Sequence, residues 1–247
     1  MPRRARKQSS TRIYHVMLRG INKQAIFKDD EDNKKFLYFI KDHKDVCEFD
    51  IYGYCLMVNH VHLLIKEGEE KLDQIIKRIG IRYAYWYNKK YSRCGHLFQD
   101  RYRSEAVESE SYFITVLRYI HQNPIKAGLC KSLDEYKWSS YKNYLKNSGN
   151  INTKIALDLI GVNEFDKYMN DISSCTYLDK TLESEKISDT ALSLEIEKQY
   201  SIKATMIKNE PKETMKKLLR SILETNGVST RQLSRVTGIS TGIIWKL

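Results

Sequence analysis

The alternation of apolar and polar residues in the first half of the chain predicts a set of short β-strands. Ile13–Arg19 alternates and is rich in β-branched residues. Asp50–Met57 and His60–Lys66 are two apolar runs joined by only two residues, which is the pattern of a β-hairpin. Two shorter runs, Leu97–Gln99 and Ser104–Val107, also have strand character. The pattern therefore predicts an antiparallel sheet.

Three segments between and after these strands have apolar residues at helical spacing: Asp29–Val46, Leu72–Trp86 and Glu110–Gln122. The third should end at Asn123-Pro124, because the residue before a proline disfavours the helical conformation. A trailing helix is expected over Asp134–Lys146. The order strand, helix, hairpin, helix, strand, helix is that of an α+β, ferredoxin-like fold, an antiparallel sheet with helices on one face.

The end of the chain predicts an all-helical tail. Lys212–Thr225 is amphipathic, a short helix with a Ser or Thr cap follows it, and another helix begins near Ile239. Two short helices joined by a turn with glycine indicate a helix-turn-helix DNA-binding module, with Arg231, Ser240 and Thr241 as candidate DNA contacts. Because the sequence stops at Leu247, the last helix is short, and the module is expected to be truncated or degenerate.

The distribution of charge changes this picture more than the total of +11 does. Residues 1–147 carry a net +10, residues 148–200 a net −5 and residues 201–247 a net +6. Two separate basic blocks favour a polyanionic partner, most often nucleic acid. We therefore expect a basic arm over 1–12, a catalytic or binding domain over 13–147, a partly helical acidic connector over 148–205 and the DNA-binding tail over 206–247.

The five cysteines form no C-x-x-C pair, which argues against a zinc knuckle or a disulfide framework. No run is long and apolar enough for a membrane span, and the basic start lacks the apolar stretch of a secretory signal. The expected setting is cytoplasmic and, for a DNA-binding protein, nucleoid-associated, with no membrane partner.

His60 and His62 are the first candidate site residues. Residues two apart in a strand share a face, so both imidazoles project together while Val61 and Leu63 point into the core. Such a pair can bind one divalent ion, but two histidines are an incomplete ligand set, and a bare His-x-His is more often a solvated polar pair.

The third predicted helix offers the missing groups. Tyr119 and Asn123 are four residues apart, so they are neighbours on one helix face. If this helix packs beside the strand of the two histidines, Asn123 could lend an amide oxygen to an ion and Tyr119 would lie next to it. A mixed nitrogen and oxygen site suits Mg²⁺ or Mn²⁺ better than structural zinc. The plain alternative is that Tyr119 only packs, as most half-buried tyrosines do, and that Asn123 only ends a helix.

Several motifs in this order resemble one family. They are Tyr14-His-Val-Met-Leu-Arg-Gly20, His60-Val-His62, Gly95-His-Leu-Phe-Gln-Asp-Arg-Tyr-Arg103, Tyr119-Ile-His-Gln-Asn123-Pro-Ile-Lys-Ala-Gly128 and Trp138-Ser-Ser-Tyr141. Over about residues 10–147 the chain resembles the HUH single-tyrosine transposases, in particular the REP-associated branch. Val58 departs from the proline usual in that hairpin turn, which affects no reacting group.

The resemblance implies an endonuclease and strand transferase for single-stranded or hairpin DNA. Tyr119 would be the nucleophile that forms a five-prime phosphotyrosine link, and His60, His62 and Asn123 would hold Mg²⁺ or Mn²⁺. No nucleotide cofactor is expected, because the covalent link keeps the bond energy for rejoining. Candidate DNA contacts in this domain are Arg101, Arg103, Lys126 and the aromatic Tyr85, each equally readable as an ordinary surface residue.

Other functions stay open from the sequence alone. A domesticated DNA-binding or regulatory protein could keep the fold without transposition. A replication or conjugation initiator would share the chemistry, although the chain length and motif order argue against it. An RNA-binding module is disfavoured because the strands lack the expected aromatic pattern. Monomer and homodimer are both compatible with the sequence.

Overall fold

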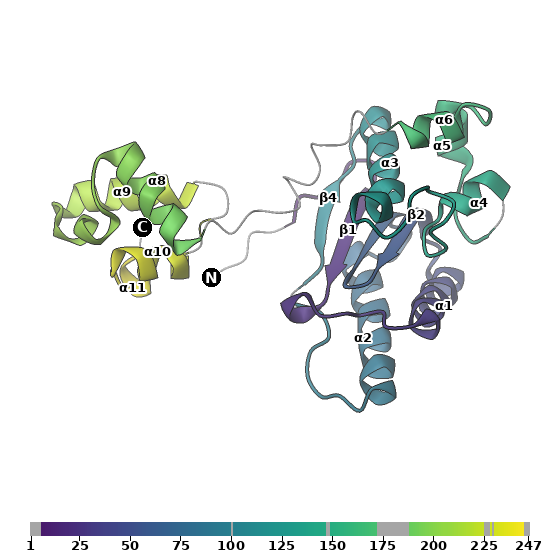
Figure 1. Ribbon diagram of the computed structural model, residues 1–247, viewed down its shortest axis with the longest axis horizontal. Coiled ribbons are helices and arrows are strands. Elements are labelled where there is room, and N and C mark those ends of the chain that lie inside the picture. The colour runs from purple at the N-terminus through teal and green to yellow at the C-terminus, as the bar shows by residue number, and fades with distance from the viewer. Residues whose placement is uncertain are drawn as a thin grey trace. The chain divides into compact units, whose positions relative to one another are not determined.

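The computed structural model describes residues 6–99, 101–146, 149–171, 188–224, 228 and 230–244. The chain divides into two compact units, residues 1–175 and 176–247, which are treated separately (Figure 1). This division differs from the expected boundaries at 147 and 205. The expected connector is shared between the units. In the first unit, α5 (Lys154–Ile160) and α6 (Phe165–Asn170) pack against α3 (Glu110–Lys126). In the second unit, α8 (Asp189–Tyr200) packs against α10 (Thr230–Thr237). Residues 1–5 of the expected arm lie outside the described residues.

The first unit is built on a four-stranded antiparallel sheet with the order β2-β3-β1-β4. The strands are β1 (Ile13–Arg19), β2 (Asp50–Met57), β3 (His60–Lys66) and β4 (Arg103–Ala106). Helices α1 (Asp30–Cys47) and α2 (Leu72–Lys90) pack together on one face, where Val16, Leu63 and Ile75 belong to one apolar core. The predicted α+β, ferredoxin-like plan is confirmed by this order and connectivity.

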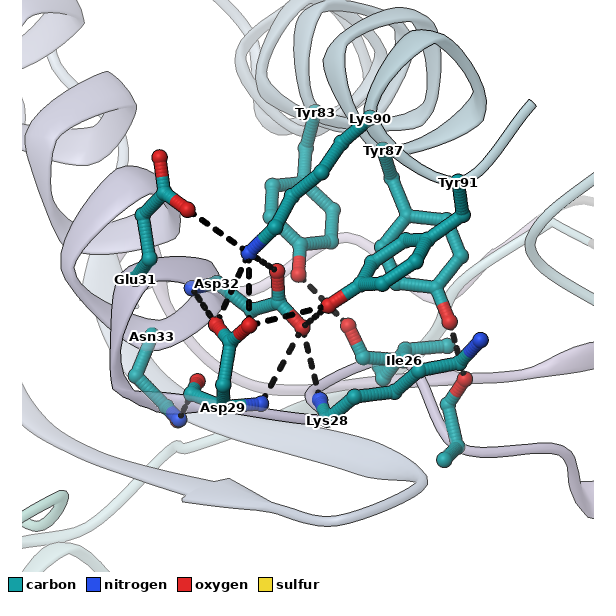
Figure 2. Close-up of polar contacts among 11 residues, drawn as sticks. Ile26, Lys28, Asp29, Glu31, Asp32, Asn33, Tyr83, Tyr87, Lys90 and Tyr91 are labelled. Atoms are coloured by element: carbon teal, nitrogen blue, oxygen red, sulfur yellow. Dashed lines mark hydrogen bonds and ion pairs between the residues drawn. The ribbon is translucent and has the colours of Figure 1, made fainter. Parts of the chain in front are cut away.

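The two helices on this face are joined by a buried polar network (Figure 2). Asp29 caps α1 and forms a capping box with Asp32, whose side chain is fully buried. The Lys90 ammonium, near the end of α2, lies 2.8 Å from carboxylate oxygens of Asp29, Glu31 and Asp32. Burial lowers the pKa of Lys90, but its hydrogen bonds to these carboxylates raise the pKa by more. The network ties the start of α1 to the end of α2.

Helix α3 (Glu110–Lys126) lies on the opposite face of the sheet, so the expectation of helices on one face holds for α1 and α2 only. Phe113 packs edge-on against Tyr52 of β2, with ring centroids 5.1 Å apart. Leu117 lies directly over Gly53, where an added Cβ would stand 2.6 Å from a Leu117 methyl group. Glycine at this position lets α3 approach the sheet closely.

Three predicted elements differ from the structure. α3 continues through Pro124 to Lys126. Proline lacks the N–H that would donate to the carbonyl four residues earlier, but helical bonding resumes beyond it, where the N–H of Ala127 donates to the carbonyl of Asn123. Leu97–Gln99 is no strand and makes a single bridge, Phe98 to Gly20. Only the end of Asp134–Lys146 is helical, as α4 (Tyr141–Lys146). The preceding Trp138 and Ser140 bond to Leu56 and Tyr54 of β2, and those bonds occupy backbone groups that a helix would need.

His121 of α3 is buried away from the sheet, among Tyr141, Tyr144 and Phe165, and its Nε2 lies 2.8 Å from Ser140 Oγ. Burial lowers its pKa to about 3. A histidine in the unfolded chain has a pKa of about 6.5. Between pH 3 and this value, the unfolded state therefore binds more protons than the folded state. The free energy of unfolding should therefore fall as the pH drops from about 6.5 towards 3.

His121→Gln, which can keep the bond to Ser140, is expected to reduce this pH slope by up to about 1.4 kcal/mol per pH unit. Urea unfolding of the full chain in EDTA at pH 7, 6 and 5 measures it. His96→Gln, which changes an exposed histidine, is the matched control. An unchanged slope in His121→Gln would show that His121 does not carry this dependence.

The second unit is helical and has its own core. It contains α8, the 3-10 segment η3 (Ala204–Asn209), α9 (Lys212–Glu224), α10 (Thr230–Thr237) and α11 (Thr241–Ile244). Leu192, Leu219, Leu233 and Ile244 are among the residues buried together. Gly238, with φ of +71°, forms the turn between α10 and α11. None of the helices in the described part of the chain is long and apolar enough to cross a membrane.

Candidate active site on the α3 face of the sheet

The structure brings the predicted strand and helix together. In β3, His60 and His62 project to the α3 face, while Val61 and Leu63 lie in the core with α1 and α2. The ring of Tyr119 stands edge-on to His62, with centroids 5.6 Å apart, and the rings of His60 and His62 are 4.9 Å apart. The two histidines and the tyrosine therefore form one cluster.

Asn59, in the hairpin turn, fixes the ring of His60. Its side-chain Nδ2 donates to the carbonyl of Lys23 over 3.2 Å, which leaves Oδ1 facing His60. Nδ1 of His60 lies 2.6 Å from that oxygen, so it must be the protonated nitrogen that donates. The remaining nitrogen, Nε2, then carries a lone pair.

His15 of β1 stands behind His62 and was not predicted from the sequence. Its Nε2 lies 3.0 Å from Nδ1 of His62, and the two rings stack with centroids 5.3 Å apart. His15 is only 1% exposed and also meets the ring of Tyr119 edge-on at 5.8 Å. The alternation of β1, applied residue by residue, would have placed His15 and Arg19 on the face of the two histidines.

Burial keeps these imidazoles neutral. Desolvation lowers the pKa of His15 to about 4 and, together with the charge of Arg19, the pKa of His60 to about 4. The pKa of His62 is held well below its ordinary value, first by burial and then by His15, His60 and Arg19. The neutral imidazole is the form that binds a cation.

Asn123 follows one helical turn after Tyr119, and its Nδ2 donates to the Tyr119 carbonyl over 3.0 Å. The amide oxygen is therefore the side-chain atom of Asn123 that remains available as a ligand for a metal ion. Two neutral imidazoles, each with one unprotonated ring nitrogen, and an amide oxygen are a set of ligand atoms that fits a divalent cation. The residues present are thus compatible with the predicted Mg²⁺ or Mn²⁺.

Two of the predicted DNA contacts lie near this cluster. The ammonium of Lys126 is 5.0 Å from the centre of the Tyr119 ring. Arg103 is paired with Met17 across β1 and β4, and it is exposed. Arg101 is exposed two residues earlier in the chain. Tyr85 is 74% exposed but lies on α2, which covers the other face of the sheet, so the structure does not bring it to the cluster.

The predicted contacts of the second unit have the exposure that DNA binding needs. Arg231, Ser240 and Thr241 are all exposed, at the beginning of α10 and around the beginning of α11.

A second group of metal-binding residue types lies elsewhere in the first unit. His43, Cys47 and Glu70 have ligand atoms within 4.8 Å of one another, the one such group of three among the described residues. The Glu70 carboxylate is 2.9 Å from His43 Nε2 and 2.9 Å from an Arg78 nitrogen. Its hydrogen bonds are therefore satisfied without an ion, and it joins α1 to the segment before α2.

Comparison with known proteins gives one family match for the segment that contains the site. Residues 8–123, which include His60, His62, Tyr119 and Asn123, match the family described as IS200-like transposases. Through this segment, which is just under half of the chain, the chain is similar to the IS200-like transposases. This match supports a transposase-like function on DNA.

The fold comparison agrees with the family. The solved structure of a REP-associated tyrosine transposase bound to a REP hairpin matches with a TM-score of 0.51 and 15% sequence identity. The match covers 62% of this chain and 94% of that protein, and at this identity it shows a shared fold. No curated protein matches the chain by sequence.

Proposed function

We propose that the first unit cuts and rejoins single-stranded DNA through the hydroxyl of Tyr119. The phenol oxygen would attack a backbone phosphorus, giving a five-prime phosphotyrosine, and the displaced three-prime oxygen would leave as a hydroxyl after taking up a proton. The observation that carries the proposal is the Tyr119 ring standing 5.6 Å from His62, beside the His60 imidazole, whose Nε2 is free to bind a cation. Rejoining reverses the step and needs no nucleotide cofactor.

His60, His62 and Asn123 would hold a divalent cation, Mg²⁺ or Mn²⁺. When bound, such an ion polarises the phosphate and stabilises negative charge on its oxygens. The chain itself supplies further positive charge, because Lys126 lies over the Tyr119 ring and Arg19 is close enough to His60 to lower its pKa. These cations would favour a bound phosphate.

The proposed substrate is single-stranded DNA next to a hairpin. The solved relative of the same fold is bound to a REP hairpin. Three basic residues are suited to contact backbone phosphates beside the cluster. They are Arg101, just before β4, Arg103, the first residue of β4, and Lys126, the last residue of α3.

The test is a covalent adduct assay. The full chain is incubated with Mn²⁺ and hairpin oligonucleotides carrying randomised single-stranded flanks. Label at the three-prime end should then migrate with the protein on a denaturing gel, while label at the five-prime end should be released. Absence of any adduct across the library would contradict the proposal.

We also propose that the second unit binds duplex DNA. The turn at Gly238, the buried Leu233 and Ile244 and the exposed Ser240 and Thr241 form a short helix-turn-helix arrangement with its polar residues outward. Residues 201–247 carry a net +6, which supports a polyanionic partner.

Arg231→Ala should weaken binding of the full chain to random duplex DNA and lower the slope of log affinity against log salt by about 1. Fluorescence anisotropy at several salt concentrations measures both. Glu213→Gln, which removes an exposed acidic residue of the same unit, is the control and should not weaken binding. If Arg231→Ala has the DNA affinity and the salt dependence of wild type, Arg231 does not contact the DNA.

A further inference from the structure

The hydrogen bond between His15 and His62 has a chemical consequence for metal binding. Nε2 of His15 and Nδ1 of His62 are 3.0 Å apart, and both residues are 1% exposed. Two neutral imidazoles in contact share one proton between the facing nitrogens. Which ring donates decides the protonation of the other nitrogen of His62.

Only one of the two arrangements lets His62 bind a cation. If Nδ1–H of His62 donates to His15, Nε2 of His62 keeps its lone pair and can be a ligand. If Nε2–H of His15 donates instead, Nε2 of His62 carries a proton and cannot bind an ion. The partner of His62 therefore sets whether His62 is a ligand.

The surroundings favour His62 as the donor. When Nε2 of His15 accepts, its Nδ1 must carry the proton, and that nitrogen is buried without a hydrogen-bond partner. Glu105 of β4 is directly opposite His15 in the strand register, and its Oε2 is also buried without a partner. Directly opposed side chains lie on one face with Cβ atoms about 5 Å apart, so this carboxylate is the acceptor nearest in the strand register to the other nitrogen of His15, although no hydrogen bond joins the two atoms in the structure. In the other tautomer, with His15 as the donor, Nδ1 of His15 would be unprotonated and could not donate to the Glu105 carboxylate.

We propose that His15 is a positioning residue that holds His62 in the tautomer with Nε2 free, with Glu105 behind His15 as the acceptor for its other nitrogen. The inference rests on the proposed function only in that His62 is taken as a cation ligand. It parallels the role of Asn59, which holds His60 in the same tautomer.

The test uses three variants of the full chain. His15→Phe keeps an aromatic ring but removes the acceptor, whereas His15→Gln places an amide oxygen near the same point. Met17→Leu is the matched control, since Met17 is a buried residue of the same strand, directly opposite His62, without a hydrogen bond to it.

Two readouts separate positioning from packing. In ¹⁵N spectra of histidine-labelled, metal-free protein, His62 of wild type and Met17→Leu should be protonated on Nδ1, and His15→Phe should lose that preference. In calorimetric titrations with Mn²⁺ alone, His15→Phe should bind about 10- to 100-fold more weakly, and His15→Gln should recover most of the loss.

Protonation of wild-type His62 on Nε2 would overturn the inference, as would wild-type Mn²⁺ affinity in His15→Phe. Should His15→Phe fail to fold, the spectrum of wild type and the affinity of His15→Gln still decide the question. The adduct assay is independent of both readouts. A wild type that gives these results without forming an adduct would contradict the proposed function and leave the role of His15 standing.

Discussion

Tyr119→Phe is expected to abolish the covalent adduct, a loss of at least about a thousandfold in cleavage rate, because the substitution removes only the oxygen that would bond to phosphorus. The phenylalanine ring can keep the edge contacts to His15 and His62 and the contact with Lys126. Affinity for the uncut oligonucleotide should therefore stay within about twofold of wild type, measured by anisotropy. Loss of cleavage without loss of binding identifies the hydroxyl as the reacting group.

Tyr112→Phe is the matched control for this experiment. Tyr112 is a half-buried tyrosine of the same helix, and its pKa is raised by burial and by the neighbouring Glu105. It does not contact the histidine cluster among the interactions of the described residues, so its hydroxyl should be dispensable. If the adduct persists in Tyr119→Phe and disappears in Tyr112→Phe, the nucleophile is Tyr112 and not Tyr119.

Elements specified by local pattern were predictable, and elements specified by distant partners were not. The strands Ile13–Arg19, Asp50–Met57 and His60–Lys66 begin and end where alternation and the hairpin turn place them. Trp138–Ser140 carries no such local signal, because its conformation follows from bonds to β2 more than eighty residues earlier. The pattern also could not assign α3 to a face of the sheet, since that choice depends on space above Gly53.

The same distinction divides the site. His60 and His62 share a face by strand geometry, and Tyr119 and Asn123 are neighbours by helix geometry, so spacing alone pairs them. His15 reaches His62 only through the register of β1 against β3, in which Met17 rather than His15 is opposite His62. Alternation along β1 places His15 on the same face as the two histidines, but no local pattern contains the register that brings it to His62.

The network between α1 and α2 provides the second large expected effect. Oδ2 of Asp32 accepts from the backbone N–H of Lys28 over 2.6 Å and from the hydroxyl of Tyr91 over 2.9 Å. Its other oxygen is 2.8 Å from the Lys90 ammonium (Figure 2). One buried carboxylate thus satisfies a helix terminus, a phenol and a cation. Removing it leaves these groups unpaired where water has little access.

Asp32→Ala is therefore expected to lower the free energy of unfolding by about 3 to 5 kcal/mol, measured by urea unfolding at pH 7. Asp32→Asn keeps an acceptor for the Lys28 N–H but loses the charge opposite Lys90, so its loss should be smaller. Glu31→Ala, which removes an exposed partner of Lys90, should have the least effect. If Asp32→Ala were no less stable than Glu31→Ala, the buried carboxylate would not be what joins the helices.

Because the network lies on the face of the sheet opposite Tyr119, folded Asp32→Asn should still form the covalent adduct. This result would separate the stability of the scaffold from the chemistry on its other side.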